Sequence, residues 1–282
     1  MILRPVHTIS RIRLETDRYP AEGLRLGFVP TMGALHRGHE ALIRRAGLEC
    51  DRVAVSVFVN PLQFSPEEDL RGYPRNLEKD LQVCASLGVD LVFAPSPEEM
   101  YPAPQLAYVD VDSLTEHLCG PFRPGHFRGV ATVVLKLLNI IRPARAYFGE
   151  KDYQQLVVIR KMISDLNLTV EIVPVATVRE SDGLACSSRN AYLDPERRSK
   201  APLLYRALEA ARDEIVAGLK DPVAAREAGL KTLAGEAEIE VEYLQIVDIA
   251  SLQPVNRVTR PVLIAGAVRI GSTRLIDNIV HP

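Results

Sequence analysis

The sequence lacks an excess of charge of either sign. Its 282 residues carry 34 Lys and Arg against 36 Asp and Glu, a formal net charge of −2 at pH 7. Proteins that bind nucleic acid or anionic membranes through non-specific electrostatics usually display a basic excess. The composition therefore gives no reason to expect either partner. The length suits one large domain or two moderate ones, each with a sizeable core.

Cysteines and long apolar runs are also scarce. The four cysteines, Cys50, Cys84, Cys119 and Cys186, stand far apart and show no paired spacing for a metal. They are typical of free thiols in a reducing compartment, so we expect a cytoplasmic protein. No basic-then-apolar leader opens the sequence, and its most apolar long segment, 130–141, is interrupted by Lys136. We expect no targeting or membrane-spanning segment.

Strand and helix patterns alternate over the first 180 residues. Short apolar runs rich in β-branched residues predict buried strands at 26–29, 53–59, 89–94, 145–149 and 169–175. Helical patterns fall at 10–17, 39–50, 77–87, 126–141 and 152–166. This alternation predicts right-handed crossovers and an α/β fold with a doubly wound, Rossmann-like parallel sheet. Prolines at 95, 97, 102 and 104 predict a long surface excursion within it.

The pattern changes after residue 190. Segments 195–218 and 222–234 are helical, and three strand-like runs follow at 239–247, 262–269 and 275–280. We expect a domain boundary near 175–185. The predicted organisation is a Rossmann-like nucleotide- and substrate-binding domain over residues 1–180 and a smaller C-terminal α+β domain over 181–282.

The loop after the first predicted strand of the sheet is the strongest candidate site. Residues 30–39 read PTMGALHRGH, in which Pro30 ends the strand and two glycines precede a helix start. Backbone N–H groups and the helix dipole at such a start attract anions. His36 and His39 can both donate to phosphate oxygens there. Taken alone the pair is equally compatible with a structural role, and a metal site is less favoured because no nearby Cys or carboxylate completes a ligand set.

Four further polar clusters follow predicted strands or precede predicted helices. Ligands of such sheets gather beyond the carboxyl ends of the strands. Asn60 and Gln63 suggest a small amide-lined pocket or an ordinary capped turn. Arg123 and Arg128 suit the binding of an acid or a phosphate as well as a surface or dimer face. The remaining two segments, 148–155 and 182–190, suit a nucleotide-binding turn and a donor-rich loop over a polyphosphate, or plain connections.

In combination these motifs resemble the pantoate–β-alanine ligase family over nearly the whole chain. Five segments match in the family's order: PTMGALHRGH (30–39), FVNPLQF (58–64), RPGHFRGV (123–130), FGEKDYQQ (148–155) and DGLACSSRN (182–190). The first is similar to the His-x-Gly-His signature shared with class I aminoacyl-tRNA synthetases and related nucleotidyltransferases. Each motif is modest alone, and five in order are very specific.

The resemblance implies a two-step ATP-dependent reaction. The carboxylate of pantoate attacks the α-phosphorus of Mg-ATP, and the amine of β-alanine then attacks the acyl carbon of the adenylate while AMP leaves. No protein nucleophile is needed, which agrees with the lack of a Ser-His or Cys-His pattern. The work left to the protein is positioning and charge stabilisation. The partners implied are these small molecules and a second copy of the chain, as a homodimer.

The resemblance also implies the site residues. His36 and His39 are the catalytic pair on the phosphates, with His39 the candidate acid. Binding of ATP is assigned to Met32, Gly33, His36, Gly38, His39, Gly149, Glu150, Lys151, Asp152, Val178, Cys186, Ser187, Ser188 and Arg189. Binding of pantoate and β-alanine is assigned to Gln63, Gln155, Asn60 and Met32. Asp80 matches a carboxylate that assists Mg²⁺, the implied cofactor. Cys186 stands where the family generally has a larger apolar side chain, and residues 181–282 are implied to form a lid.

Two other hypotheses remain open from the residues. One is a nucleotidyltransferase that adenylates another small acid. Gln63 and Gln155 favour a neutral, hydroxylated acid over a phosphorylated one, which would prefer Arg or Lys. The other is a non-catalytic nucleotide-binding module, which would bind ATP without ever producing AMP. A tRNA-binding synthetase is less favoured, because the chain has neither a large appended domain nor a basic excess.

Overall fold

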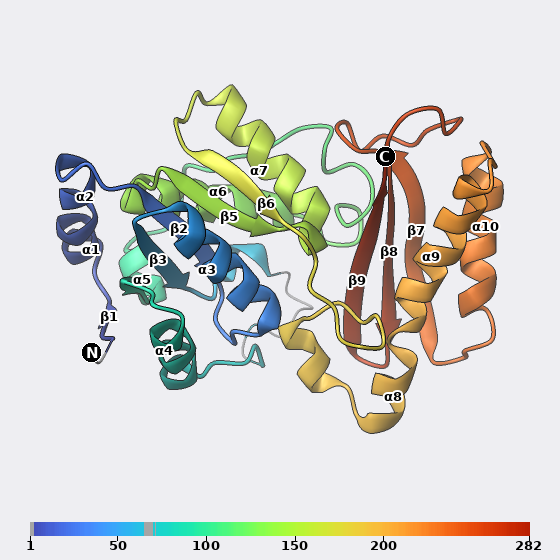
Figure 1. The fold of residues 1–282 in the computed structure, drawn as a ribbon, viewed down its shortest axis with the longest axis horizontal. Helices are drawn as coiled ribbons and strands as arrows, with labels where there is room; N and C mark the ends of the chain where they lie inside the picture. Colours follow the sequence, from blue (N-terminus) through green and yellow to red (C-terminus); the bar gives the residue numbers. More distant parts are fainter. Residues whose placement is uncertain (1–2, 65–69, 71) are drawn as a thin grey trace. The chain divides into compact units, whose positions relative to one another are not determined.

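The computed structural model describes residues 3–64, 70 and 72–282. The chain divides into two compact units, and Figure 1 labels their elements. Unit 1 comprises Met1–Val111, Arg123–Glu150 and Val158–Ala176, and unit 2 comprises Asp112–Phe122, Lys151–Val157 and Thr177–Pro282. Two short segments from within the first 180 residues therefore fold with the C-terminal part of the chain.

Unit 1 contains a six-stranded sheet. Its strands are β1 (Pro5–Val6), β2 (Leu26–Thr31), β3 (Arg52–Val57), β4 (Leu91–Phe93), β5 (Arg145–Gly149) and β6 (Glu171–Val175). The spatial order is β1-β4-β3-β2-β5-β6, and every neighbouring pair is parallel. From β2 the chain runs outward to β4, then returns across the sheet to β5 and β6. The predicted doubly wound α/β architecture is confirmed.

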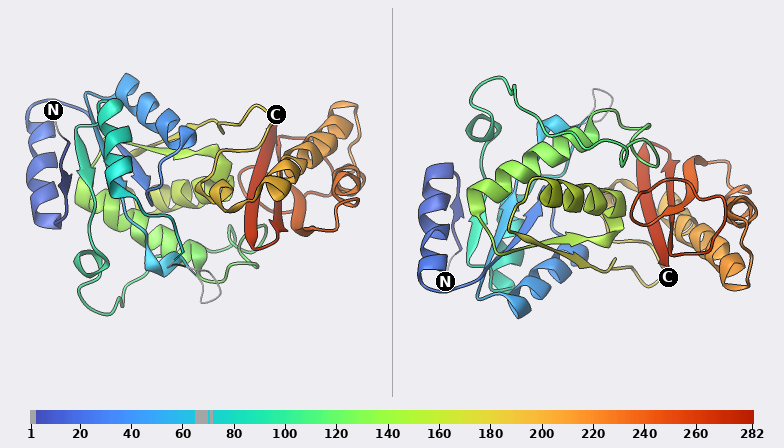
Figure 2. Two further views of the ribbon diagram at one scale, coloured as in Figure 1. Left: turned by 90° about the horizontal axis from the view of Figure 1, so that it is seen from below. Right: turned by 90° about the horizontal axis from the view of Figure 1, so that it is seen from above.

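Helices cover both faces of this sheet. The helices of this part of the chain are α1 (Ile9–Thr16), α2 (Arg18–Ala21), α3 (Arg37–Glu49), α4 (Leu77–Ser86), α5 (Pro97–Met100), α6 (His126–Ile141) and α7 (Tyr153–Asp165), the last of which begins in unit 2. The helices α3 and α4 lie on one face and α6 on the other (Figure 2). Ile43 and Ala46 of α3 and Cys84 of α4 pack on Val55 and neighbouring strand residues. Three 3-10 turns complete the elements that matter below: η1 (Pro61–Gln63), η2 (Glu150–Asp152) and η3 (Ser188–Tyr192).

Unit 2 is built on a three-stranded antiparallel sheet. Its strands, β7 (Ile239–Asp248), β8 (Val262–Ile270) and β9 (Thr273–His281), pair in chain order. Three helices accompany it: α8 (Pro195–Lys200), α9 (Leu203–Val216) and α10 (Pro222–Leu233). Leu204 and Leu208 of α9 pack with Val268 and Ile270 of β8 in a separate hydrophobic core. The smaller C-terminal α+β fold is confirmed.

Two sequence-based predictions of elements are wrong, and short elements such as β1 and α2 were missed. The single helix over 195–218 is two helices, because Pro202 cannot donate to the preceding turn and its ring clashes with it. Strand β1 was not predicted, since two residues carry no periodic pattern. The proline-rich excursion contains α5, whose Met100 is fully buried, so it is not confined to the surface.

The composition led to two expectations, one for the cysteines and one for membrane-spanning segments. All four cysteines are free thiols, as predicted. Cys84 is fully buried, and this burial raises the pKa of its thiol to about 12. Among the described residues, the helices are too short or too polar to traverse a lipid bilayer.

Candidate active site

The loop after β2 is held by a carboxylate from another helix. Asp80 of α4 is almost fully buried, and its two oxygens accept the backbone N–H groups of Ala34 at 3.0 Å and Leu35 at 2.8 Å. Gly33 has φ +84°, and a Cβ there would lie 2.9 Å from Asp80 Oδ2. Only glycine fits this turn without displacing the carboxylate. Met32, Gly33 and Asp80 line one cavity of about 390 Å³ within unit 1.

The predicted catalytic histidines form the N-terminal cap of α3. His36 Nδ1 accepts the N–H of Gly38 at 3.1 Å, and His39 Nδ1 accepts the N–H of His36 at 3.4 Å, a reciprocal capping box. The ring centroids are 4.1 Å apart. An imidazole whose Nδ1 accepts carries its proton on Nε2 when neutral. The backbone of the helix start thus sets both rings in the tautomer that donates from Nε2.

Asn60 and Gln63 lie at the turn η1, beside the loop after β2. Asn60 Nδ2 donates to Gln63 Oε1 at 3.1 Å, and Gln63 Nε2 lies 3.1 Å from the sulfur of Met32. A thioether is a weak acceptor, so this amide is oriented rather than strongly bound. Three of the residues predicted to bind pantoate and β-alanine are therefore in mutual contact within unit 1.

The start of α6 supports η1. His126 Nδ1 donates to the backbone carbonyl of Gln63 at 2.9 Å, and Arg123 Nη1 donates to His126 Nε2 at 2.9 Å. Gly129 permits the close approach, since a Cβ there would lie 2.2 Å from the carbonyl oxygen of Leu62. The side chain of Arg123 is buried at this position. Arg128, by contrast, is exposed and stacks on Tyr108 with its Cζ 4.2 Å from the ring centroid.

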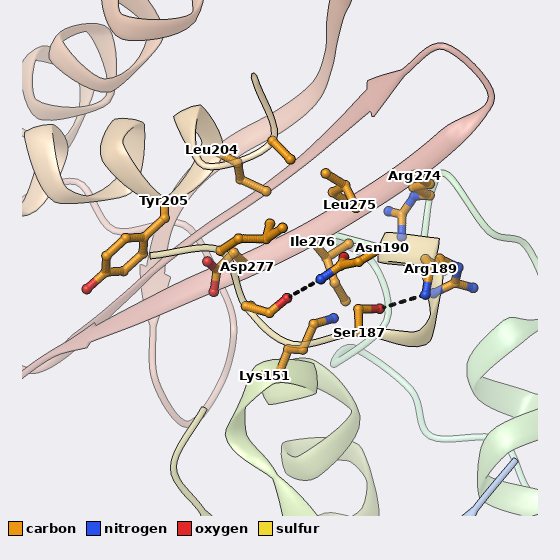
Figure 3. A pocket seen from close by; sticks show the side chains of 13 residues that line it. Lys151, Ser187, Arg189, Asn190, Leu204, Tyr205, Arg274, Leu275, Ile276 and Asp277 are labelled. Atoms are coloured by element: carbon orange, nitrogen blue, oxygen red, sulfur yellow. Dashed lines mark hydrogen bonds between the residues drawn. The ribbon is translucent and has the colours of Figure 1, made fainter. Parts of the chain in front are cut away.

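Lys151 and five residues of the 182–190 loop, Ser187 and Arg189 among them, face one small cavity inside unit 2. Figure 3 shows Lys151, Ser187 and Arg189 around it, opposite Arg274 and Asp277 of β9. Its volume is about 10 Å³, room for roughly one water, so it is a contact point rather than a cavity for a whole nucleotide. Gly149 ends β5 and Glu150 opens η2, and both belong to unit 1.

Hydrogen bonds shape the loop that carries the donors. Cys186 N donates to Val178 O at 2.9 Å, and an isolated bridge joins Arg179 to Ala185, so the segment folds back as a hairpin. Ser187 Oγ accepts the N–H of Arg189 at 3.3 Å and starts η3. The hairpin brings Val178 beside Cys186, both predicted to bind ATP.

The other residues predicted to bind ATP or pantoate lie in 3-10 turns or in the first turns of helices. Asp152 closes η2, Ser188 opens η3, Gly38 lies in the first turn of α3, and Gln155 lies half-buried in the first turn of α7. Its neighbour Gln154 is buried and holds the 112–122 segment. Within unit 1 the structure thus groups Met32 with Gly33, Asp80 and Gln63, and within unit 2 it groups Lys151 with Ser187 and Arg189.

Sequence reasoning missed the polar residues of β9. Arg274, Asp277 and Asn278 are all buried in a strand that is otherwise mostly apolar. Arg274 Nη2 and Asn190 Oδ1, on the same cavity, are buried without a hydrogen-bond partner in the described part of the chain. The signal available in the sequence was the pair Asp277-Asn278 inside a strand pattern, where polar side chains must be paired.

The doubly wound sheet and the histidine-capped helix start after β2 define a Rossmann-like α/β protein of the kind that handles nucleotides. The chain belongs to the pantoate–β-alanine ligase family, whose profile matches residues 4–280. Membership makes it an ATP-dependent enzyme that forms the amide bond between pantoate and β-alanine.

Relatives and solved structures agree over nearly the full length. A pantothenate synthetase of Pelotomaculum thermopropionicum is 51% identical over 274 residues, 97% of each chain. One of Heliobacterium modesticaldum is 52% identical over 278 residues, 99% of each chain. A pantothenate synthetase structure from Thermus thermophilus has a TM-score of 0.94 at 50% identity and covers 98% of this chain and 99% of its own. A Francisella tularensis pantoate–β-alanine ligase complexed with beta-gamma ATP and beta-alanine has a TM-score of 0.81 at 35% identity, covering 99% and 97%.

Proposed function

We propose that this chain activates pantoate as pantoyl adenylate before the amine of β-alanine attacks. The pantoate carboxylate bonds to the α-phosphorus of ATP and pyrophosphate leaves. The amine then bonds to the acyl carbon, AMP leaves with the electrons of the broken C–O bond, and the amine loses a proton. The observation that carries this proposal is the capping arrangement of His36 and His39, which sets two Nε2 donors at the positive end of α3.

Contacts with ATP are proposed separately for the residues of unit 1 and for those of unit 2. His36 and His39 donate to phosphate oxygens, where negative charge grows as the pentacoordinate phosphorus forms. Backbone groups of Met32, Gly33, Gly38 and Gly149 allow close approach of the nucleotide. The remaining proposed ATP contacts are Glu150, Lys151, Asp152, Val178, Cys186, Ser187, Ser188 and Arg189. The shared cavity of Lys151, Ser187 and Arg189 supports their acting together on one anionic group.

Pantoate and β-alanine are proposed to bind through amides. Asn60 fixes the orientation of Gln63 through the 3.1 Å hydrogen bond to Oε1, which leaves the Nε2 side of Gln63, beside Met32, to meet a hydroxyl or carboxylate oxygen. Gln155 is the second proposed amide. Such uncharged donors suit a hydroxylated acid without a phosphate.

Magnesium is proposed to enter as the counter-ion of ATP. Asp80 fits a metal ligand poorly, because both of its oxygens already accept backbone N–H groups of the loop after β2. The described residues also contain no group of three or more His, Cys, Asp or Glu side chains placed to hold a metal ion. Asp80 therefore supports the loop, and the chemistry Mg²⁺ supplies, charge neutralisation on the phosphates, comes with the substrate.

The proposal has three finer features, of which the homodimer and the lid come from the resemblance. We propose a cytoplasmic location, which the four free thiols support. The homodimer is to be tested by light scattering. The lid role of 181–282 is supported by the separate core that this part of the chain contributes to unit 2. Hydrogen exchange with and without ATP and pantoate would test it, with protection of the 182–190 loop expected.

Pyrophosphate exchange across candidate acids tests the proposed function. Exchange of labelled pyrophosphate into ATP should require pantoate and should not require β-alanine. Exchange that depends on a different acid would replace pantoate as the substrate. ATP binding without AMP formation under any condition would favour a non-catalytic module instead.

A further inference from the structure

Asp277 of β9 forms a buried ion pair with Arg179. Its carboxylate accepts from Arg179 Nη1 at 2.5 Å and from Nη2 at 3.0 Å, a bidentate arrangement. The side chain of Asp277 is 4% exposed and that of Arg179 20%. Burial raises the pKa of Asp277 above its ordinary value in spite of the guanidinium. Because desolvating both charges is costly, such a pair is weak as a source of stability and better suited to fixing a geometry.

The fixed side chain of Arg179 also holds the hairpin that ends at Cys186. Its Nη1 also donates to the carbonyl of Gly183 at 3.0 Å, and its Cζ lies 3.7 Å from the ring centroid of Tyr205. One guanidinium is thus fixed by a strand, a helix and the turn of its own hairpin. The hairpin leads directly into Ser187 and Arg189.

Asn278, the next residue of β9, contacts the turn that carries Lys151. Asn278 Nδ2 donates to the backbone carbonyl of Lys151 at 2.8 Å, across 127 positions of sequence. Arg179 Nη2 is also 3.4 Å from the carbonyl of Asn278. Adjacent residues of one strand therefore contact the turn that carries Lys151 and the base of the hairpin that carries Ser187.

We propose that Asp277 and Asn278 are positioning residues for the phosphate contacts of this ligase. They hold the turn that carries Lys151 and the Ser187–Arg189 segment in fixed positions relative to each other. The ammonium of Lys151 and the donors of the loop then meet the same group of phosphate oxygens. The inference rests on the proposed ATP roles of Lys151 and Ser187. Donors held in place before the reaction lower its barrier more than donors that must be ordered during it.

A double-mutant cycle on Asn278 and Lys151 tests the first contact. Asn278→Ala should lower kcat/KM for ATP in pantoate-dependent pyrophosphate exchange by about 10- to 100-fold, the loss that a displacement near 1 Å can cause. The KM for pantoate should change less than threefold. If Asn278 acts through Lys151, adding Asn278→Ala to Lys151→Ala should lower kcat/KM for ATP by less than about a further twofold. Independent, multiplying losses would overturn the proposal.

The second contact is tested with Asp277→Asn, which keeps the shape of the side chain and removes its charge. In a Ser187→Ala, Arg189→Ala double mutant, adding Asp277→Asn should lower kcat/KM for ATP by less than about a further twofold. Val280→Ala, on an exposed position of the same strand, is the matched control and should retain the wild-type kinetics. Thermal unfolding of each variant shows whether it is folded under assay conditions.

The possible outcomes separate this inference from the proposed function. Loss of less than threefold in both Asn278→Ala and Asp277→Asn overturns the inference and leaves the function intact. Lys151→Ala with unchanged exchange overturns the role of Lys151 and the inference with it. Absence of pantoate-dependent exchange in the wild type overturns the function itself. If Asn278→Ala does not fold, Asn278→Ser replaces it, and failure of both to fold would assign Asn278 to the fold alone and overturn its positioning role.

Discussion

The carboxylate of Asp80 accepts the backbone N–H of Leu35 at 2.8 Å, so a helix that follows β3 fixes the loop that follows β2. Its other oxygen accepts the N–H of Ala34. Asp80→Ala leaves two backbone donors without a partner in a largely buried place. We expect it to lower the free energy of unfolding by about 2–6 kcal/mol, at roughly 1–3 kcal/mol per orphaned group. Urea denaturation measures this.

Asp80→Asn is the companion variant, because its amide keeps one oxygen acceptor and should lose about half as much stability. Both variants should weaken ATP binding by a similar factor with and without Mg²⁺, since the loop rather than the metal is affected. A loss of affinity that appears only when Mg²⁺ is present would make Asp80 a metal ligand and contradict the support role.

Removal of the imidazole of His39 tests the donor role of the helix cap. We expect His39→Ala to lower kcat by about 10²- to 10³-fold, comparable with the loss of one transition-state donor. Part of the capping box is lost too, so unfolding should become easier by about 1 kcal/mol. His39→Asn restores a side-chain acceptor for the His36 N–H and should recover the stability without the turnover. A change in kcat below about threefold would contradict the role.

How far the sequence predicts this structure depends on the range of the interactions. Helix α6 was predicted with the bounds that the structure shows, because its sixteen residues are strongly patterned. Gly125 and Arg142, which flank it, both adopt positive φ. Strand β5 was likewise predicted in full from a short apolar run. Such elements are set by local composition, which a sequence displays directly.

The partners of Asp80, Asp277 and Asn278 were not predictable in the same way. Their long-range contacts span between 45 and 127 positions of sequence, and no local pattern records which distant group a carboxylate or amide will meet. The motif residues themselves were predicted through resemblance. What the sequence concealed is the set of residues that hold them.

Gln154 and Gln155 provide a matched pair of adjacent amides with different roles. Gln154 is buried, accepts the N–H of Cys119 at 2.9 Å and donates to the carbonyls of Leu114 and His117, both at 2.9 Å. We expect Gln154→Ala to cost about 3 kcal/mol or more of stability, because three groups of the 112–122 segment lose a partner at roughly 1 kcal/mol or more each. Urea denaturation should show the loss.

Gln155→Ala should instead leave stability within about 0.5 kcal/mol, as is usual for a partly exposed position. It should raise the KM for pantoate more than that for ATP. Steady-state kinetics with each substrate varied in turn would show the split. A larger rise for ATP would move Gln155 from the pantoate pocket to the nucleotide pocket.

Gly129 and Gly47 are both helical glycines, and only one of them is tightly packed. A Cβ at Gly129 would lie 2.2 Å from the carbonyl oxygen of Leu62 and 2.7 Å from the N of Gln63, whereas a Cβ at Gly47 has nothing within 4 Å. We expect Gly129→Ala to destabilise the protein by about 1–3 kcal/mol through overpacking. It should also raise the KM for pantoate, because η1 must move. Gly47→Ala in α3 should stabilise by about 0.5–1 kcal/mol. Equal effects of the two in unfolding experiments would contradict the packing argument.

Asp248 gives a prediction that depends on pH. Its Oδ1 accepts the N–H groups of Ser251 at 2.8 Å and Ala250 at 3.1 Å and the hydroxyl of Ser251 at 2.8 Å. These bonds, the Ser251 N–H first, outweigh burial and hold the pKa of Asp248 below its ordinary value. Because the folded-state pKa is the lower one, the stabilisation is fully present above about pH 4, the unfolded value, and is lost as pH falls through the folded value.

Asp248→Ala should therefore cost about 1–3 kcal/mol at pH 7, as expected for buried donors left without an acceptor. The difference from the wild type in urea denaturation should shrink steadily as the pH falls below about 4. Arg260→Ala removes the exposed partner of the same carboxylate. It should lower the free energy of unfolding by less than about 1 kcal/mol, both at pH 7 and below about pH 4. A difference between Asp248→Ala and the wild type that stayed constant from pH 7 to about pH 3 would show that the carboxylate charge does not stabilise this turn.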